Sequence, residues 1–299
     1  MTDCTTIKVG QFCLGGPVGA YPTALFGTIF FEGQDLLIDS EEGIFDVKKA
    51  QRQIHISSKA CQELAVPLFL DVVAETEQAI SNEIEFVIRE FDTPFLVDAS
   101  DEDIRMRGLE IVSELSALDR TVYNSISVDS TDEELKLIER LQPAAIVVSA
   151  IDTTNYGVDS ALETVNQVKD RLSSDLHHKL LLDIGFLDEV SVKMSCDIGH
   201  KLRKLTRLPV GGAPCNGLHM WESLKARGEK VFVASLAATL GFCTAFGLDF
   251  LFAGPLRHIN LVASAQGVAD VYNRYNLMVN NRDQTFNNNH PIQAMFKTG

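Results

Sequence analysis

Short apolar runs alternate along the chain with longer segments whose apolar residues recur at helical spacing. The short runs are rich in Leu, Val, Ile and Phe, which is typical of strands buried on both faces of a parallel sheet. They predict strands at 22–31, 68–73, 94–98, 120–124, 144–150, 179–183, 208–212 and 250–254. The longer segments predict helices at 46–64, 76–91, 101–118, from 131, at 158–176, 189–207 and 263–278, and two helices within 216–247.

This alternation of eight strands with helices predicts a closed (β/α)8 barrel, the TIM-barrel fold. An open doubly wound sheet is the alternative, but no G-x-G-x-x-G motif follows the first strand. Residues 7–16 predict a small β-hairpin that caps one end of the barrel, within an N-terminal hairpin and loop at 1–20. We expect residues 1–299 to form a single domain that ends in a polar, Asn-rich tail at 280–299.

Two helix starts carry capping signals. Asp46 precedes the first helix and is expected to be its N-cap. Thr131 and Glu134 match a capping box, in which the threonine hydroxyl binds a backbone N–H and the glutamate reaches back to the threonine N–H. Both signals mark the start of a helix between two predicted strands.

Polar residues occur at or near the carboxyl ends of the predicted strands, where barrel enzymes place their active sites. They are Asp71, Glu75, Asp98, Asn124, Ser149, Asp183 and Asn216. This set contains carboxylates and carboxamides and almost no cations. Such groups suit a ring that displays N–H and amino donors beside a carbonyl, as a pterin does. A phosphate would instead require Lys, Arg or a Gly-rich helix start.

Composition narrows the class of protein. The net charge of −15 argues against non-specific binding of nucleic acid, since phosphates are neutralised by Lys and Arg. The six cysteines are scattered without a C-x-x-C pair, which favours reduced thiols and a cytoplasmic protein. No signal peptide is recognisable, and polar and glycine residues interrupt the longest apolar stretch, 231–246. We therefore expect a buried helix there and no membrane span.

Two Cys/His pairs raise the question of a metal. Cys196 and His200 are four residues apart, as are Cys215 and His219, and this spacing places both side chains on one face of a helix. Cysteine and histidine bind zinc, but a tetrahedral site needs further ligands, which we could not place. We therefore predict no metal.

Five motifs, in order along the chain, resemble one family. They are G-G-P-V-G-A-Y-P-T-A-L-F-G-T-I-F-F (15–31), D-V-V-A-E-T (71–76), P-F-L-V-D-A-S (94–100), Y-N-S-I (123–126) and G-G-A-P-C-N-G (211–217). The chain resembles the H subunit of tetrahydromethanopterin S-methyltransferase and its soluble bacterial relatives. Among these it looks most like the methyltransferases that pass methyl groups between a corrinoid protein and tetrahydrofolate, including that of glycine betaine demethylation. More distantly it resembles dihydropteroate synthase, a pterin-binding TIM barrel.

The resemblance implies an enzyme of one-carbon or methylamine metabolism. It would move a methyl group from the cobalt of a corrinoid, carried by a partner protein, to N5 of tetrahydrofolate, giving 5-methyltetrahydrofolate. Tetrahydromethanopterin is the alternative pterin. A non-catalytic pterin-binding subunit of a larger methyl-transfer complex is the alternative role, and a barrel lyase or hydrolase is a third possibility. A homodimer formed through the apolar stretch 231–246 is expected, as in related barrels.

The resemblance also assigns residues. Asp98, Asn124 and Asp183 match the groups that hydrogen-bond the pterin ring, and Asn216 matches the residue that approaches N5. Asn216 and Asp98 are therefore the candidate catalytic residues. Glu75 and Ser149 are further candidate pterin contacts. The basic residue that dihydropteroate synthase places after its seventh strand is absent here, which counts against a synthase. The alternative for Asn216 is a cap on a helix that begins at residue 218.

Overall fold

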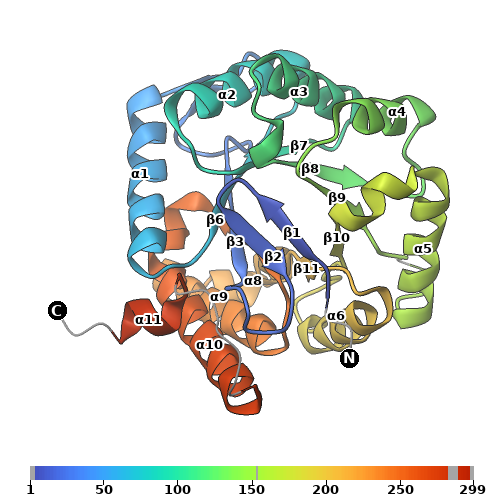
Figure 1. Ribbon diagram of the computed structural model, residues 1–299. Coiled ribbons are helices and arrows are strands. Elements are labelled where there is room, and N and C mark those ends of the chain that lie inside the picture. Colours follow the sequence, from blue (N-terminus) through green and yellow to red (C-terminus); the bar gives the residue numbers. More distant parts are fainter. Residues whose placement is uncertain (1–3, 153, 282–288, 297–299) are drawn as a thin grey trace.

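The structure is a computed structural model that describes residues 4–152, 154–281 and 289–296. Eight parallel strands close into a barrel in the order β10-β11-β12-β3-β6-β7-β8-β9 (Figure 1). The strands are β3 (Ala24–Ile29), β6 (Leu68–Val73), β7 (Phe95–Asp98), β8 (Thr121–Ile126), β9 (Ala145–Ser149), β10 (Leu180–Asp183), β11 (Val210–Gly212) and β12 (Phe250–Pro255). Each coincides with a predicted strand, so the predicted TIM-barrel fold is confirmed.

Helices surround the barrel and connect consecutive strands (Figure 1). They are α1 (Val47–Glu63), α2 (Glu77–Glu90), α3 (Glu102–Glu114), α4 (Asp132–Leu141), α5 (Val158–Arg171), α6 (Val192–Thr206), α9 (Glu229–Ala245) and α10 (Ile259–Asn280). Two short helices, α7 (Pro214–Met220) and α8 (Glu222–Lys225), precede α9, so the region predicted to hold two helices holds three. A last helix, α11 (Pro291–Met295), lies in the predicted tail, of which residues 282–288 and 297–299 are outside the described residues.

The predicted hairpin closes the amino-terminal end of the barrel. Strands β1 (Thr6–Val9) and β2 (Phe12–Gly15) pair antiparallel. The Thr5 N–H donates to the Arg207 carbonyl at 2.8 Å, and the Gly10 N–H donates to the Asp119 carbonyl at 2.9 Å. Arg207 and Asp119 both stand shortly before barrel strands. The hairpin therefore leaves the carboxyl ends of the strands as the open face.

Aromatic rings fill the barrel interior. The Phe26 ring lies 5.0 Å from Phe69, 5.2 Å from Phe250 and 5.1 Å from Phe252 between centroids. Phe12 of the hairpin extends the cluster, with its ring 5.9 Å from Phe69. Buried aromatic pairs add to the stability given by area burial alone and fix the rings in place. This core supports the residues at the strand ends.

One of the two predicted helix caps forms differently from the prediction. The Asp46 carboxylate accepts the Lys49 N–H at 3.1 Å, as expected for an N-cap. The Thr131 hydroxyl also accepts the Glu134 N–H, at 3.2 Å. However, Glu134 does not reach back: its carboxylate is buried and accepts from Arg105 and Tyr123, while the Thr131 N–H donates to Glu102 at 3.4 Å. The predicted reciprocal bond was wrong because a buried, charge-assisted interaction is stronger.

The helix at 231–246 is less buried than expected, and a small β pair at 37–45 was not predicted. The apolar stretch 231–246 forms α9, which buries one face, including Leu236 and Leu240, and exposes the other, including Phe242. Across the described part of the chain, none of the helices has the length and apolar character needed to span a bilayer. The segment 39–42, with three acidic residues, runs from the end of β4 (Leu37–Asp39) into the turn before β5 (Ile44–Phe45), a small antiparallel pair that the sequence did not predict.

Candidate active site at the carboxyl end of the barrel

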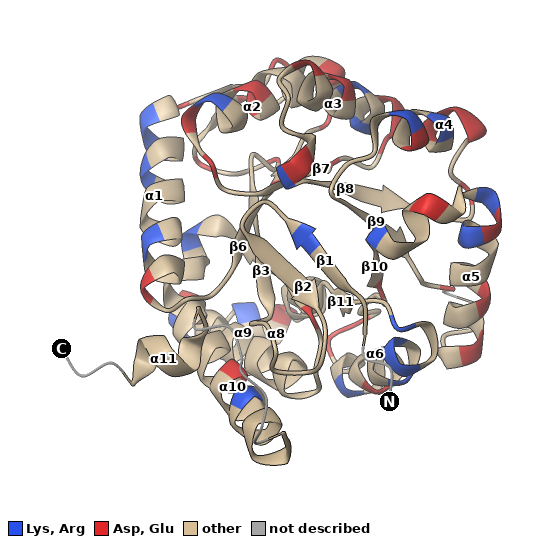
Figure 2. Cartoon of the chain, in the orientation of Figure 1, with Lys and Arg blue, Asp and Glu red and all other residues tan. Residues whose placement is uncertain are grey.

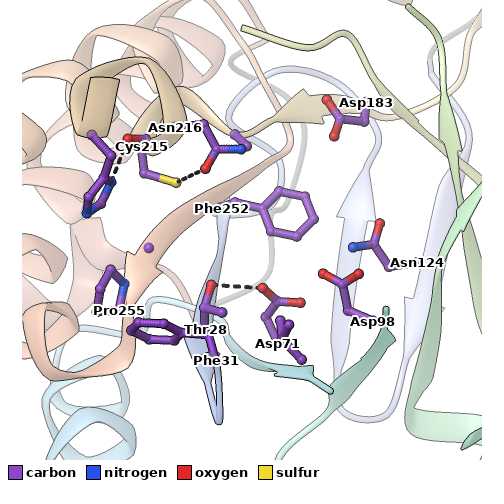
Figure 3. A pocket seen from close by; sticks show the side chains of 14 residues that line it. Thr28, Phe31, Asp71, Asp98, Asn124, Asp183, Cys215, Asn216, Phe252 and Pro255 are labelled. Atoms are coloured by element: carbon purple, nitrogen blue, oxygen red, sulfur yellow. Dashed lines mark hydrogen bonds between the residues drawn. The ribbon is translucent and has the colours of Figure 1, made fainter. Parts of the chain in front are cut away.

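A cavity of about 390 Å³ opens at the carboxyl ends of the barrel strands. Most of its walls come from strand ends and from α7. The lining residues are Thr28, Phe31, Asp71, Val73, Asp98, Asn124, Asp183, Ala213, Cys215, Asn216, His219, Phe252, Gly254 and Pro255. Figure 3 shows the labelled side chains gathered around one space, with Phe252 between Asn216 and the carboxyl groups of Asp71 and Asp98. Four of the predicted site residues, Asp98, Asn124, Asp183 and Asn216, therefore lie together.

Strand register explains why these residues meet. Asp98 at the end of β7 pairs directly with Asn124 of β8. Asp183 ends β10 and pairs with Ser149 of β9. Side chains alternate between the inside and the outside of a barrel strand. Ser149 is half-buried and lies outside the cavity walls. Glu75, beyond the end of β6, is exposed and also lies outside them, so ligand contacts by Ser149 and Glu75 stay predictions.

The three carboxyl groups share an environment that disfavours ionisation. Burial raises the pKa of Asp183 to about 6, against the lowering effect of the Gly185 N–H, which donates at 2.8 Å. Burial likewise raises the pKa of Asp71 to about 6. Burial and the adjacent charge of Asp71 raise the pKa of Asp98 well above its usual value. Among the described residues that line the cavity, none is Lys or Arg, so no cation compensates these carboxylates.

Arg105, which does not line the cavity, supports the backbone that follows Asp98. Its guanidinium donates to the carbonyls of Ala99 and Ser100, at 2.7 and 3.0 Å, and these residues directly follow Asp98. It also donates twice to Glu134 Oε1, at 2.7 and 3.0 Å. The charge of Arg105 opposes the rise in the pKa of Asp98. Sequence reasoning missed Arg105, although it occupies a buried position of α3 between Ile104 and Gly108.

Helix α7 carries the second group of cavity residues. It begins at Pro214, so Asn216 lies inside the helix and the alternative role as a cap before residue 218 was wrong. The Cys215 thiol donates to Asn216 Oδ1 at 3.5 Å. One turn further on, His219 Nδ1 donates to the Cys215 carbonyl at 2.8 Å, and its ring packs on Phe232 with centroids 4.8 Å apart. Helix α7 therefore places three polar side chains on the cavity: Cys215 and Asn216 from the motif G-G-A-P-C-N-G, and His219 just after it.

The described residues contain no group of three or more His, Cys, Asp or Glu side chains arranged to hold a metal ion. Cys196 lies mid-helix in α6, buried, with its sulfur 3.6 Å from that of Cys243. Two of the cavity residues that sequence reasoning left out, Thr28 and Phe252, come from the strands β3 and β12. Their signal was weak: a threonine or phenylalanine inside an apolar strand is common.

Comparison with known proteins places the chain in a family. The model of the tetrahydromethanopterin S-methyltransferase MtrH subunit family matches residues 3–280. The chain belongs to this family. The H subunit of tetrahydromethanopterin S-methyltransferase from Methanococcus maripaludis is 30% identical over 220 residues, covering 71% of this chain and 69% of that protein. The corresponding protein from Methanopyrus kandleri is 26% identical over 231 residues, covering 73% and 72%. The family predicted from the five motifs is thereby confirmed.

Solved structures resemble the MtrH-family barrel in fold. Dihydropteroate synthase from Yersinia pestis superposes with a TM-score of 0.65 at 12% identity, covering 90% of this chain and 98% of that chain. The 7,8-dihydropteroate synthase from Vibrio fischeri gives a TM-score of 0.63 at 14% identity, covering 89% and 97%. At these identities the likeness concerns the barrel and its closure.

Proposed function

We propose that the chain is a methyltransferase subunit that binds a tetrahydropterin in the barrel cavity and handles the methyl group on N5. The observation that carries the proposal is the convergence of Asp98, Asn124 and Asp183 on one cation-free cavity in a chain of the MtrH family. Carboxylates accept hydrogen bonds from ring N–H and amino groups, and a carboxamide both donates and accepts. A cavity of about 390 Å³ is within the range of small-molecule sites.

The pterin we propose is tetrahydromethanopterin. The sequence interpretation preferred tetrahydrofolate, but the matching family and the relatives compared above are named for tetrahydromethanopterin. The two compounds share the bicyclic ring and its N5 atom, so Asp98, Asn124 and Asp183 would face the same ring edge in either. Glu75 and Ser149 could then meet only parts of the ligand outside the cavity.

We propose further that the methyl group is exchanged with a corrinoid on a partner subunit. The corrinoid supplies the cobalt that accepts or donates the methyl group. This chain holds the ring and provides a hydrogen bond to N5, which otherwise is a poor leaving group. Asn216 is the proposed donor, because α7 sets it on the cavity wall, on the far side of Phe252 from Asp98 (Figure 3). The relatives are named as one subunit of a methyltransferase, which supports work within a larger assembly.

We also propose that the protein forms a homodimer. Helix α10 exposes Leu261, Val268, Tyr272, Tyr275 and Val279, spaced to form one stripe along the helix. Figure 2 shows α10 largely free of charged residues, and the two that it carries are buried. In a chain of net charge −15, two copies meet with least repulsion on such an uncharged face. We therefore place a two-fold interface on α10 and the exposed side of α9.

Calorimetric titration with tetrahydromethanopterin and tetrahydrofolate, each with and without the N5 methyl group, tests the proposal. We expect binding of the methanopterin forms, and a loss of about 2–4 kcal/mol in Asp98→Ala, as for a removed charge-assisted contact. Methyl transfer to a reduced corrinoid separates an enzyme from a non-catalytic binding subunit. Failure of the wild-type protein to bind either pterin would exclude the function, and tighter binding of tetrahydrofolate would reverse the choice of pterin.

A further inference from the structure

Asp71 is a cavity residue to which no role has been assigned above. It lies on β6 between Thr28 of β3 and Asp98 of β7, and only 2% of its surface is exposed. Its Oδ2 atom accepts the Thr28 hydroxyl at 2.8 Å (Figure 3). Its Oδ1 atom is buried and accepts no hydrogen bond from the described residues, while the Asp98 carboxyl interacts with the Asp71 carboxyl at hydrogen-bonding range. A buried carboxylate oxygen without a donor is costly, which favours a proton held between the two carboxyl groups.

Among the described residues that line the cavity around the Asp71–Asp98 pair, none is Lys or Arg. Asp183 faces it from β10, and Asn124 faces it from β8. From α7 come His219 and the Cys215 thiol, whose pKa is raised by burial to about 12. Arg105, behind Asp98, is bound by Glu134, which balances its charge. Two neighbouring buried carboxyl groups without a cation cannot both ionise at low cost, so the pair retains one proton near neutral pH.

We propose that Asp71 holds this proton when the pterin is bound, and that this proton, in place of a cation, keeps Asp98 ionised against the ring. The inference rests on the proposed function, in which Asp98 accepts a hydrogen bond from a ring N–H. An O–H bond on Asp98 breaks, an O–H bond forms at Oδ1 of Asp71, and no proton is exchanged with solvent. Asp71 then donates to Asp98 and still accepts from Thr28 at Oδ2. Asp71 is thus a positioning residue that acts through Asp98.

A measurable consequence is the pH dependence of affinity. The binding form carries one proton on the pair, so affinity should be highest where the pair holds one proton and should weaken at acid pH, where Asp98 is protonated as well. It should fall by about tenfold per pH unit once the pair loses that proton. Asp71→Asn mimics the neutral acid: its amide N–H points toward Asp98 and its amide oxygen accepts from Thr28. The variant should bind within about threefold of the wild type at pH 6 and should bind more tightly than the wild type at pH 9.

Three further variants isolate the pair. Thr28→Val removes the donor that favours ionised Asp71, so the fall in affinity should move to higher pH by about one unit. His219→Gln removes the histidine that lines the cavity and should leave the fall in place. Asp98→Asn should weaken binding at every pH, because an amide does not replace the charged acceptor.

Calorimetric titration of these variants with methylated tetrahydromethanopterin from pH 6 to pH 9 decides the matter. A wild-type affinity that does not change with pH, or a loss in Asp71→Asn as large as that in Asp98→Asn, would overturn the inference while leaving the proposed function intact. A fall that disappears in His219→Gln would also overturn it. If the wild-type protein binds no tetrahydropterin at any pH, both proposals fail together, and that outcome is separate from the others.

Discussion

Replacing Asn216 with alanine tests the chemical step separately from ring binding. The side chain lies inside α7, and the Cys215 thiol donates to it at 3.5 Å, which is a weak interaction. Alanine has the higher helix propensity at an interior position, by up to about 0.7 kcal/mol. The free energy of unfolding should therefore change by less than about 1 kcal/mol, and the fold should be kept.

The expected loss is in the rate of methyl transfer. If the Asn216 amide donates to N5 mainly while the bond between N5 and the methyl carbon breaks, its contribution belongs to the transition state. Removing one such donor lowers a rate by roughly 10²–10³, which corresponds to about 2.7–4 kcal/mol. Affinity for the methylated pterin in the ground state should change by less than about threefold, since Asp98, Asn124 and Asp183 still hold the ring.

Stopped-flow absorbance of the corrinoid during a single turnover measures this rate, and calorimetry measures the affinity. Met220→Ala is the matched control, because Met220 ends the same helix and is 57% exposed, outside the cavity walls. It should transfer the methyl group at the wild-type rate. An Asn216→Ala protein that is equally fast would show that Asn216 is not the N5 donor. An affinity loss as large as the rate loss would make Asn216 a ring-binding residue.

Three further predictions follow from buried charges and from the α10 surface. Because folding raises the pKa of Asp183 to about 6, the stability linked to its protonation is complete below pH 4 and is lost as pH rises through 6. At pH 8 the free energy of unfolding of Asp183→Asn, measured in urea, should therefore exceed that of the wild type by about 2–3 kcal/mol. At pH 4 the two proteins should be equally stable. Arg105→Met should cost about 3–5 kcal/mol by leaving Glu134 buried and unpaired, and the double variant Arg105→Met/Glu134→Leu should recover most of this in urea unfolding. Tyr272→Glu should convert the proposed dimer to a monomer in sedimentation at micromolar concentration; a wild-type monomer would remove the α10 interface.

The barrel was predictable because its signals are local. Each buried parallel strand is a short apolar run, and each following helix has its own periodicity, so the order of elements could be read along the chain. The site followed from the same logic, since the ends of parallel strands meet at one face. Asp98 and Asn124 end neighbouring strands and pair directly, which the sequence spacing already implied.

What the sequence did not predict depends on contacts between distant segments. Glu134 matches a capping box locally, but Arg105 and Tyr123 approach it from other elements and take over its carboxylate. Ser149 was assigned to the rim by its place at the end of β9, yet the cavity does not include it. Asp71 was expected at the same rim and does line the cavity, but its partner Thr28 comes from β3, 43 residues earlier in the chain.

The arrangement of Arg105 and Glu134 also explains why the cavity remains free of positive charge. Arg105 lies close enough to lower the pKa of Asp98, but Glu134 binds its guanidinium through two nitrogen atoms in the buried layer behind β7. With its charge balanced there, Arg105 fixes the backbone after Asp98 without entering the site. Beyond the hydrogen bonds from Thr28 and the Gly185 N–H, the cavity carboxyls therefore have protons and ligand N–H groups to compensate them. Such a site selects a ligand that brings several hydrogen-bond donors and disfavours an anionic group at the ring position.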